Sequence, residues 1–392
     1  MSTLLIIANI LGYIGLLLLY IQVVFGSRHI FSIVTTDTVF VNKLHSFIGK
    51  YAIFAIFLHP LLSMMNRLED VVWIITPNFF VTTEVYITFG RFAFMLFIIV
   101  WVTSAIIREK IKWRPWKYIH LLAYPIVALT FLHIIEIGSF FEKYKSIRFL
   151  WAMLLILFVV SLGVRLLAWM SITKKKYILH NKTYVGDDIM LISLLGVQHI
   201  SSRIGQHFFL QSKRFGSEHP FSVIRNSENI ITFGIRRVGG FWEEMNTKEL
   251  GDVVYVDGPY GVFTREVHTT NPKVIISAGI GVTPFIGLVE EYGKNAIYLN
   301  CNRTIDEAVE RDMIKSKVSV YVDIVNRYDG DPDPSIIVGQ LQEDIISRYV
   351  SENVQSAPYC ICGSPMFIQA VRGMLKNLGV PKHLIYYEEL GF

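Results

Sequence analysis

Five long apolar segments fill the first 172 residues, and they restrict how this part of the chain can fold. The segments lie at about 4–25, 44–65, 85–107, 117–137 and 148–171. Each reaches the roughly 20 residues that a helix needs to cross the hydrocarbon core of a bilayer. Because that core offers no water to backbone groups, a chain crosses it as helices or as a closed barrel. We therefore predict five spanning helices, the first uncleaved because no small-residue cleavage site follows it, and at most a short interfacial helix at 71–81.

The basic residues that flank these segments fall unequally on the two sides of the predicted bundle. One side is also the side of the C-terminal half of the chain. It holds Arg28, Lys43, Arg108, Lys110, Lys112, Arg114, Lys117, Lys174, Lys175 and Lys176. The other side holds Arg67, Lys143, Lys145 and Arg148. Because cytoplasmic loops carry the excess of Lys and Arg, we expect an integral plasma-membrane protein with cytoplasmic C-terminal domains and an external N-terminus. With a net charge of only +5, the chain gives little support for nucleic-acid binding.

Four histidines lie inside these apolar segments, two in the second and two in the fourth. His45 and His59 share one segment, and His120 and His133 share the other. An ionisable side chain is costly in hydrocarbon, so such residues are functional candidates. At 1.5 Å per residue the two histidines of one helix lie about 20 Å apart, and neutral imidazole is a good ligand of haem iron. We therefore predict two stacked haems rather than four histidines that only pack against neighbours. Under the predicted topology, one haem is held by His45 and His120 near the cytoplasmic face and the other by His59 and His133 near the outer face.

The spacing of the second pair poses a geometric difficulty. Fourteen residues, as from His45 to His59, return close to the same face of an ideal helix, whereas the thirteen from His120 to His133 do not. Pro125 lies between the second pair and could distort the helix enough to correct the facing.

The sequence around these histidines resembles a known membrane family. The fourth segment contains the run Trp116-Lys-Tyr-Ile-His120-Leu-Leu-Ala-Tyr124 and then Leu132-His133, which is similar to the fourth span of ferric-reductase-like transmembrane domains. The second segment contains His45-Ser-Phe-Ile-Gly49 and then His59-Pro60, which is similar to the partner span. For this superfamily, which includes NADPH oxidases, the resemblance implies that the four histidines ligate two b-type haems. Ser46 stands where a basic residue is frequent, which leaves Arg165 and Lys50 as substitutes for a propionate partner.

After Lys176 the apolar runs become short and alternate with turn residues. Five runs predict strands of an antiparallel barrel, at 189–195, 207–211, 221–225, 230–236 and 253–256. From about residue 273, predicted strands at 273–278, 296–300, 318–324 and 358–362 alternate with predicted helices at 285–292, 305–313, 340–349 and 365–377. Such alternation is typical of a parallel α/β sheet. We expect a multidomain protein, with an α-helical transmembrane haem bundle at 1–172, a β-barrel FAD domain at 173–272 and an α/β nucleotide-binding domain at 273–392.

A glycine pair follows the first strand of the predicted α/β domain. Strand 273–278 runs into Gly279-Ile-Gly281-Val-Thr283-Pro284. Glycines let backbone amides approach a pyrophosphate closely, and a proline in the first helical turn aims the helix N-terminus at that anion. In this strand–turn–helix context the pattern predicts a dinucleotide phosphate site.

Four motifs, in this order, resemble the flavin and nicotinamide module of ferredoxin reductases over essentially all of 173–392. They are His219-Pro220-Phe221-Ser222, Gly258-Pro259-Tyr260-Gly261, the Gly279–Pro284 turn and Cys362-Gly363-Ser364-Pro365. The resemblance implies that the first motif holds the flavin ring and ribityl chain of FAD, that Arg236 binds its pyrophosphate, and that Gly258 and Tyr260 belong to the cofactor site. It also implies that the dinucleotide is bound by Gly279, Gly281, Thr283, Pro284, Cys362 and Gly363.

Three further assignments depend on the same resemblance. Gly239 and Gly240 replace the usual pyrophosphate turn, so only backbone amides serve there. Arg303 follows the second α/β strand, where a 2′-phosphate would lie, and it slightly favours NADPH over NADH as the donor. Phe392 would stack on the flavin, unless it is a loose chain end.

The resemblance implies a membrane oxidoreductase of the NADPH-oxidase or ferric-reductase type, similar to prokaryotic NADPH-oxidase-like proteins. Electrons would pass from cytosolic NADPH or NADH through FAD and the two haems to an external acceptor, either O2, giving superoxide, or a ferric chelate. A flavin is needed because nicotinamide gives up hydride whereas haem iron accepts one electron at a time. No catalytic acid, base or nucleophile is required. An electron-donating or redox-sensing subunit of a membrane partner remains an alternative, and a transporter has little support.

Overall fold

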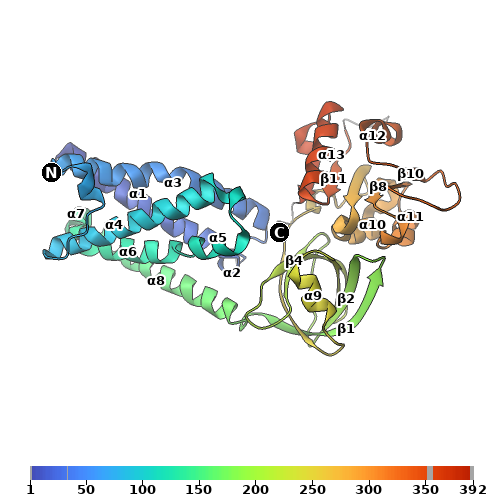
Figure 1. Cartoon of the computed structure of the whole chain (residues 1–392), viewed down its shortest axis with the longest axis horizontal. Helices are drawn as coiled ribbons and strands as arrows, with labels where there is room; N and C mark the ends of the chain where they lie inside the picture. The colour runs from blue at the N-terminus through green and yellow to red at the C-terminus, as the bar shows by residue number, and fades with distance from the viewer. Residues whose placement is uncertain (1, 33, 351–355, 389–392) are drawn as a thin grey trace. The chain divides into compact units, whose positions relative to one another are not determined.

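The computed structural model describes residues 2–32, 34–350 and 356–388 of the chain (Figure 1). The chain divides into two compact units, at 1–168 and 169–392, which are described one at a time. The first unit is helical, and the second combines a closed β-barrel with a parallel sheet. The predicted fold class is therefore confirmed.

The membrane unit has five helical segments, within the described residues, that are long and apolar enough to cross a bilayer, as predicted. They are α1 (Thr3–Phe25), α3 (Thr38–Arg67), α4 (Thr82–Trp101) with a π-helical end at Val102–Ile106, α5 (Trp113–His120) followed by α6 (Ala123–Ile137), and α8 (Lys145–Trp169). Large apolar side chains such as Ile10, Phe54 and Val159 are exposed on these helices. Continuous exposed apolar surface of this kind is expected where lipid covers a protein.

Short turns connect the spans, namely α2 (Arg28–Phe31), η1 (Val71–Ile74), η3 (Arg108–Lys110) and α7 (Ser139–Lys143). The interfacial helix considered at 71–81 is reduced to the single 3₁₀ turn η1. Asp70 accepts hydrogen bonds from the first backbone amides of this turn. Pro77 prevents its extension, because the residue before a proline is pushed out of the helical region.

The fourth span is broken between its two histidines. The helix α5 ends at His120, and α6 begins at Ala123. Pro125 explains this position, because proline has no N–H and its ring clashes with the carbonyl four residues earlier, here that of Leu121. The prediction that Pro125 distorts this helix is confirmed.

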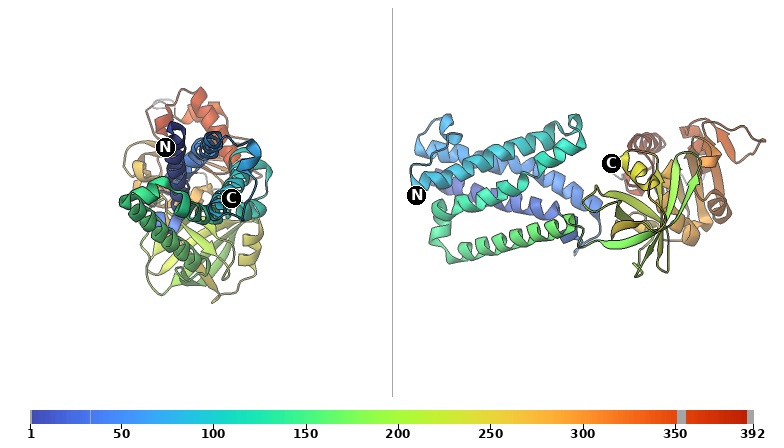
Figure 2. Two further views of the ribbon diagram at one scale, coloured as in Figure 1. Left: turned by 90° about the vertical axis from the view of Figure 1, so that its left-hand side faces the viewer. Right: turned by 60° about the horizontal axis from the view of Figure 1, so that its bottom comes forward.

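Two helix pairs bring together the elements that carry the histidines. The helix α1 packs along α3, and α4 packs along α6 (Figure 2). One buried cluster joins α1, α6 and α8 through side chains such as Leu16, Phe131 and Phe158. A second cluster joins α4 and α6 through Phe97 and Ile126. Each histidine-bearing helix therefore has a neighbouring helix tight against it.

The second unit begins with a closed antiparallel barrel. Its strands are β1 (Lys175–Val185), β2 (Ile189–Gly196), β3 (His207–Gln211), β4 (His219–Ser227), β5 (Ile230–Arg236) and β6 (Val253–Tyr260), in the order β1-β2-β5-β4-β3-β6. The five predicted strands are confirmed, but β1 is not among them, because only Tyr177 and Leu179 of its side chains are buried. Lys174, just before β1, is buried, and its ammonium group contacts Gln211 and Glu218.

The rest of the second unit is a parallel six-stranded sheet. Its strands are β7 (Lys273–Ala278), β8 (Ala296–Asn302), β9 (Val320–Val325), β10 (Ile336–Val338), β11 (Tyr359–Cys362) and β12 (Ile385–Glu388), in the order β10-β9-β8-β7-β11-β12. One face is covered by α10 (Ile286–Tyr292) and α11 (Arg311–Lys317), and the other by α12 (Glu343–Val350) and α13 (Pro365–Asn377). The two short edge strands β10 and β12 are not predicted from the sequence.

Two predicted helices differ from the structure. The helix expected at 305–313 consists of a 3₁₀ turn, η7 (Ile305–Glu307), and the separate helix α11. Glu310, which directly precedes α11, has a left-handed backbone conformation. The glycine turn does not open an α-helix directly. Residues Gly279–Phe285 wind as the 3₁₀ helix η5 before α10 begins.

Candidate functional site

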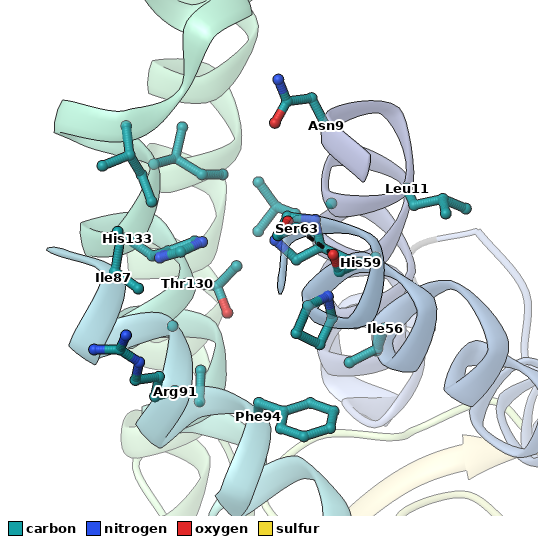
Figure 3. Close-up of a pocket in the computed structure, with 18 of the residues that line it drawn as sticks. Asn9, Leu11, Ile56, His59, Ser63, Ile87, Arg91, Phe94, Thr130 and His133 are labelled. Carbon is teal, nitrogen blue, oxygen red and sulfur yellow. Dashed lines mark hydrogen bonds between the residues drawn. The ribbon is translucent and has the colours of Figure 1, made fainter. Parts of the chain in front are cut away.

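His59 on α3 and His133 on α6 face each other across a cavity in the membrane unit (Figure 3). Their ring centroids are 6.1 Å apart, and their ring planes are inclined at 84°. Two metal–imidazole bonds of about 2 Å each, plus the distance from each nitrogen to its own ring centre, place two ligating histidines about 6 Å apart. The separation therefore fits one metal ion between the rings. We call His59 and His133 the outer pair, because the predicted topology places them nearer the external face.

The second nitrogen of each outer ring is held by a backbone carbonyl. The Nδ1 atom of His59 lies 2.7 Å from the oxygen of Ala8, and that of His133 lies 2.9 Å from the oxygen of Tyr86. A carbonyl can only accept, so both Nδ1 atoms carry the proton and both Nε2 atoms keep a free lone pair. Metal-binding histidines are typically oriented by such a bond from the other ring nitrogen.

Two glycines make room for these rings on the neighbouring helices. A Cβ atom on Gly90 of α4 would lie 2.4 Å from Nδ1 of His133, and one on Gly12 of α1 would lie 2.9 Å from Nδ1 of His59. Any side chain at Gly90 would therefore displace the imidazole or separate α4 from α6. By contrast, a Cβ atom on Gly163 of α8 would meet nothing within 4 Å.

The cavity between the outer histidines has an empty volume of about 1270 Å³, including the part that opens outward. Its lining is largely apolar and includes Leu16, Phe94 and Phe97. Binding sites for small molecules and cofactors are lined mainly by apolar side chains with a few polar groups. This lining therefore suits a mostly apolar cofactor rather than a bare ion.

Arg91 is a buried cationic side chain on the lining of this cavity, and Figure 3 shows it near His133. Its guanidinium pairs with Glu84 at 3.1 Å and lies 4.8 Å from the ring of Trp73. Its Nε atom has no hydrogen-bond partner within the part of the chain that the structure describes. Arg67 also pairs with Glu84, at 3.2 Å, so two cations share one carboxylate. The group keeps a positive charge that suits an anionic group on a cavity occupant.

The inner histidines, His45 on α3 and His120 at the end of α5, form a similar pair. Their ring centroids are 5.9 Å apart and their planes are inclined at 66°. Nδ1 of His120 lies 3.1 Å from the hydroxyl of Ser104, which also accepts a hydrogen bond from the indole of Trp116. Ser104 belongs to the π-helical end of α4, and π-helical turns inside helices are frequent at functional sites. Nδ1 of His45 has no partner among residues 2–32, 34–350 and 356–388.

Arg165 and Lys50 are the two side chains considered as partners for a propionate of the inner haem. Arg165 lies closer to the inner histidine pair. Its guanidinium donates to the carbonyl of Gly26 at 3.1 Å, and a Cβ atom on Gly26 would lie 3.6 Å from the ring of His45. The ammonium group of Lys50 instead lies over the ring of Tyr51, at 5.7 Å. The geometry thus favours Arg165 for this role.

In the second unit, the candidate dinucleotide site lies where the strand order reverses. Strands β8, β9 and β10 follow on one side of β7, and β11 and β12 lie on the other. Ligands of open α/β sheets bind outside the carboxyl ends of the strands at such a point. The turn at Gly279 follows β7, and Cys362-Gly363 ends β11, so the structure brings these predicted residues together.

Gly281 touches the end of β11 so closely that no side chain fits there. A Cβ atom at this position would lie 2.4 Å from the carbonyl oxygen of Cys362 and 2.8 Å from the nitrogen of Gly363. Thr283 is buried in the same turn, and its hydroxyl donates to the carbonyl of Ile280 at 3.0 Å. Pro284 follows it inside η5.

We expect Gly281→Ala to force the glycine turn away from β11 and to raise the KM for the nicotinamide donor on the order of 10- to 100-fold, because a shift of about 1 Å disturbs the bound geometry that much. The measurement is the steady-state reduction of a soluble dye by the flavin-loaded protein. Gly373→Ala on α13 is the matched control, since a Cβ atom there meets nothing within 4 Å. An unchanged KM in Gly281→Ala would show that the turn does not contact the donor.

The predicted flavin motif lies on β4, where Pro220 and Phe221 pair with β3. The hydroxyl of Ser222 is buried and has no partner in the described part of the chain, so it is free to bond to a ligand. His219 lies against Phe241, with ring centroids 4.7 Å apart. Burial lowers the pKa of His219, and Glu244 and Glu218 oppose that shift, so the ring is neutral at pH 7. An uncharged, partly aromatic surface of this kind fits a flavin ring.

Arg236 ends β5 and reaches toward the dinucleotide turn. Its Nη1 atom lies 3.6 Å from the position of a Cβ atom on Gly279. Gly239 directly precedes the short helix α9 (Gly240–Asn246), and Gly240 is its first residue. A Cβ atom on either glycine would meet nothing within 4 Å. These residues therefore leave room for a pyrophosphate beside Arg236.

Two further predicted cofactor residues, Gly258 and Tyr260, lie at the end of β6. Gly258 packs on Phe208, which a Cβ atom would approach to 2.7 Å, and the hydroxyl of Tyr260 donates to Asp257 at 2.9 Å. Cys362 is buried, and burial together with the nearby carboxylate of Glu388 raises the pKa of its thiol, which stays protonated. Phe392 lies outside the described residues.

Arg303 lies directly after β8 and is half-exposed. Its guanidinium is already paired with Asp188 and with Glu307. The sequence predicts a role for Arg303 but not its pairing with these two carboxylates. Asp188 precedes the arginine in the chain, and Glu307 follows it.

The membrane unit matches a known family. The family described as ferric reductase like transmembrane component matches residues 11–131. The membrane unit carries a ferric-reductase-like domain. The matched range contains His45, His59 and His120, as well as the glycines that face the outer pair, and it ends two residues before His133.

The chain is also similar to flavohemoproteins. That of Oceanobacillus iheyensis is 25% identical over 207 residues, which cover 49% of this chain and 45% of the relative. That of Rhizobium meliloti is 28% identical over 208 residues, which cover 50% and 49%. The chain thus spans less than half the length of these relatives. A flavohemoglobin structure from Malassezia yamatoensis, with bound FAD and haem, aligns with a TM-score of 0.50 at 21% identity, over 84% of this chain and 92% of that one. The barrel and parallel sheet match the ferredoxin-reductase fold.

The ferric-reductase-like domain also contains functional candidates that sequence reasoning overlooks. Arg91 lies within an apolar span, and an intramembrane arginine is by itself a signal of function. Gly12 and Gly90 give no such signal, because glycine is frequent in transmembrane helices. Only the structure shows which glycines touch a histidine.

Proposed function

We propose that this chain passes electrons from NADH or NADPH, bound by the reductase unit, to an acceptor on the far side of a bilayer. The observation that carries the proposal is the pairing of four intramembrane histidines, with ring centroids 5.9 and 6.1 Å apart. Two pairs separated by a 14-residue stretch of α3 lie about 20 Å apart along that helix. This is the spacing of two redox centres across the apolar core.

The inner pair would hold one b-type haem and the outer pair a second. When bound, FAD takes hydride from the nicotinamide and releases electrons singly, and haem iron carries them one at a time. The carbonyls of Ala8 and Tyr86 accept hydrogen bonds from Nδ1 of the outer imidazoles, which would leave each Nε2 atom available to ligate a haem iron. Arg91 and Arg165 would pair with the propionate groups, because arginine suits carboxylates in sites of low polarity.

In the reductase unit, the chain's residues bind and orient rather than react. The glycine turn admits a pyrophosphate, Arg236 adds positive charge beside it, and the free hydroxyl of Ser222 would bond to the flavin. Hydride transfer between the two rings needs no protein acid or base. Since more Lys and Arg flank the side of the C-terminal half, we place this unit in the cytoplasm and the outer pair near the external face.

Anaerobic rapid mixing of the purified protein with NADH or NADPH tests this proposal. The flavin absorbance should bleach first, and a reduced b-haem band should appear afterwards. A flavin that is reduced while the haem stays oxidised would contradict transfer between the units.

The external acceptor is O2 or a ferric chelate, and both would receive electrons at the outer pair. Superoxide formation and ferric-chelate reduction, measured on the same membranes, separate the two. Turnover by the purified chain alone would exclude the alternative of an electron-donating or redox-sensing subunit.

A further inference from the structure

The carboxyl ends of β7 and β8 lie side by side in the sheet of the second unit. These strands pair in parallel, with Ala278 opposite Cys301. Arg303 therefore lies one strand away from the glycine turn that follows β7. In dinucleotide-binding α/β folds, a carboxylate beyond the second strand bonds to the ribose 2′-hydroxyl of NAD, whereas an arginine accommodates the 2′-phosphate of NADP. Which group is available after β8 thus decides which dinucleotide fits.

The guanidinium of Arg303 is engaged by two carboxylates. Its Nη2 atom pairs with Asp188 in the turn between β1 and β2, and its Nε atom pairs with Glu307 at 3.1 Å. Two negative charges and one positive charge leave this site with a net charge of −1. A 2′-phosphate carries about −1.5 to −2 at pH 7, so it would meet repulsion rather than a free arginine.

The turn that carries Asp188 is held in place by its neighbours. Gly186 in this turn has a φ of +56°, and a Cβ atom there would lie 3.2 Å from the Cγ atom of Glu307. The carbonyl of Asp188 also accepts a hydrogen bond of 2.7 Å from the backbone N–H of Arg237. Both carboxylates are therefore fixed beside Arg303 by backbone contacts and not only by the ion pairs.

A second arginine beside Arg303 is also paired. Arg327 follows β9, and its backbone N–H donates to the carbonyl of Arg303 at 3.1 Å. Its guanidinium lies 2.9 Å from the carboxylate of Asp329. A 2′-phosphate would have to displace a carboxylate from either arginine.

We infer that Asp188 and Glu307 act as specificity-determining residues, which withhold Arg303 from a 2′-phosphate and make NADH the better donor. This inference rests on the proposed function, and it reverses the slight preference for NADPH that the sequence suggests. A carboxylate of the same pair can accept a hydrogen bond from the ribose 2′-hydroxyl of NADH.

A cycle of variants in the full-length, flavin-loaded protein tests the inference. We expect wild type to show a kcat/KM for NADH about tenfold above that for NADPH, the effect of one charge-assisted hydrogen bond. The double variant Asp188→Asn, Glu307→Gln should raise the ratio of NADPH to NADH efficiency roughly tenfold. Arg303→Ala should leave the ratio within about twofold in wild type but erase the gain in the double variant. Asp312→Asn, at an exposed carboxylate of α11, is the control that should change nothing.

A binding measurement gives a readout independent of turnover. Calorimetry with adenosine 5′-monophosphate and adenosine 2′,5′-bisphosphate compares ligands that differ only in the 2′-phosphate. The double variant should gain affinity for the bisphosphate alone. If Arg303→Ala in wild type selectively weakens the bisphosphate or NADPH, the arginine is available and the inference is wrong. If neither NADH nor NADPH reduces the flavin, it is the proposed function that fails.

Discussion

Replacing His133 with leucine is expected to lower the haem content of the purified protein from two haems per chain to one. The outer site would keep only His59, and leucine offers the metal no lone pair. Because loss of even a supporting group costs about 10- to 100-fold in metal affinity or activity, loss of a ligand should lower external acceptor reduction at least 100-fold. Haem content is measured by the pyridine haemochrome spectrum, and acceptor reduction in membrane vesicles.

The effect should be confined to the membrane unit. Reduction of the flavin by NADH should keep its wild-type rate in His133→Leu, since no residue of the reductase unit changes. His180→Leu, at an exposed histidine of β1, is the matched control and should keep both haems. If His133→Leu retains two haems per chain, the outer pair is not a ligand pair.

Gly90→Ala is expected to disturb the outer site almost as strongly, although it removes no ligand. The new methyl group would lie 2.4 Å from Nδ1 and 2.5 Å from Cε1 of His133, well inside van der Waals contact. The ring must move, and its hydrogen bond to the carbonyl of Tyr86 would be lost. We expect the occupancy of the outer haem to fall by about tenfold, in the range found when groups that orient a metal ligand are removed.

A graded series makes this test specific. Gly12→Ala places a methyl group 2.9 Å from the ring of His59, so its effect should be smaller than that of Gly90→Ala. Gly163→Ala adds a methyl group to open space and should be harmless, because alanine favours a helix by about 1 kcal/mol over glycine. Haem content and the Soret band of each variant give the order. Equal behaviour of all three glycine variants would show that close packing on the histidines does not matter.

The sequence predicts those parts of the fold that follow from local patterns. Apolar segments of spanning length give the five helices, and Pro125 predicts the break that the fourth span shows. The strand β1 escapes prediction because most of its side chains are exposed and because its lysines suggest a membrane boundary. The short edge strands β10 and β12 escape it because three or four residues carry too little pattern.

The sequence predicts the candidate metal-ligating residues of these sites, but not the residues that position them. Histidines in apolar segments are conspicuous, since an ionisable group in hydrocarbon needs a reason. The glycines that touch them and the carbonyls that orient them depend on which helices are neighbours, which no local pattern reveals. The same holds for Arg303, because Asp188 is 115 residues earlier in the chain, and only folding brings it to the arginine.

The ratio of haem to FAD in the purified full-length protein tests the central claim most directly. The account predicts two b-type haems and one FAD per chain, measured by the pyridine haemochrome spectrum and by flavin released on denaturation. Protein from iron-replete cells that contains FAD but shows no Soret band would contradict it.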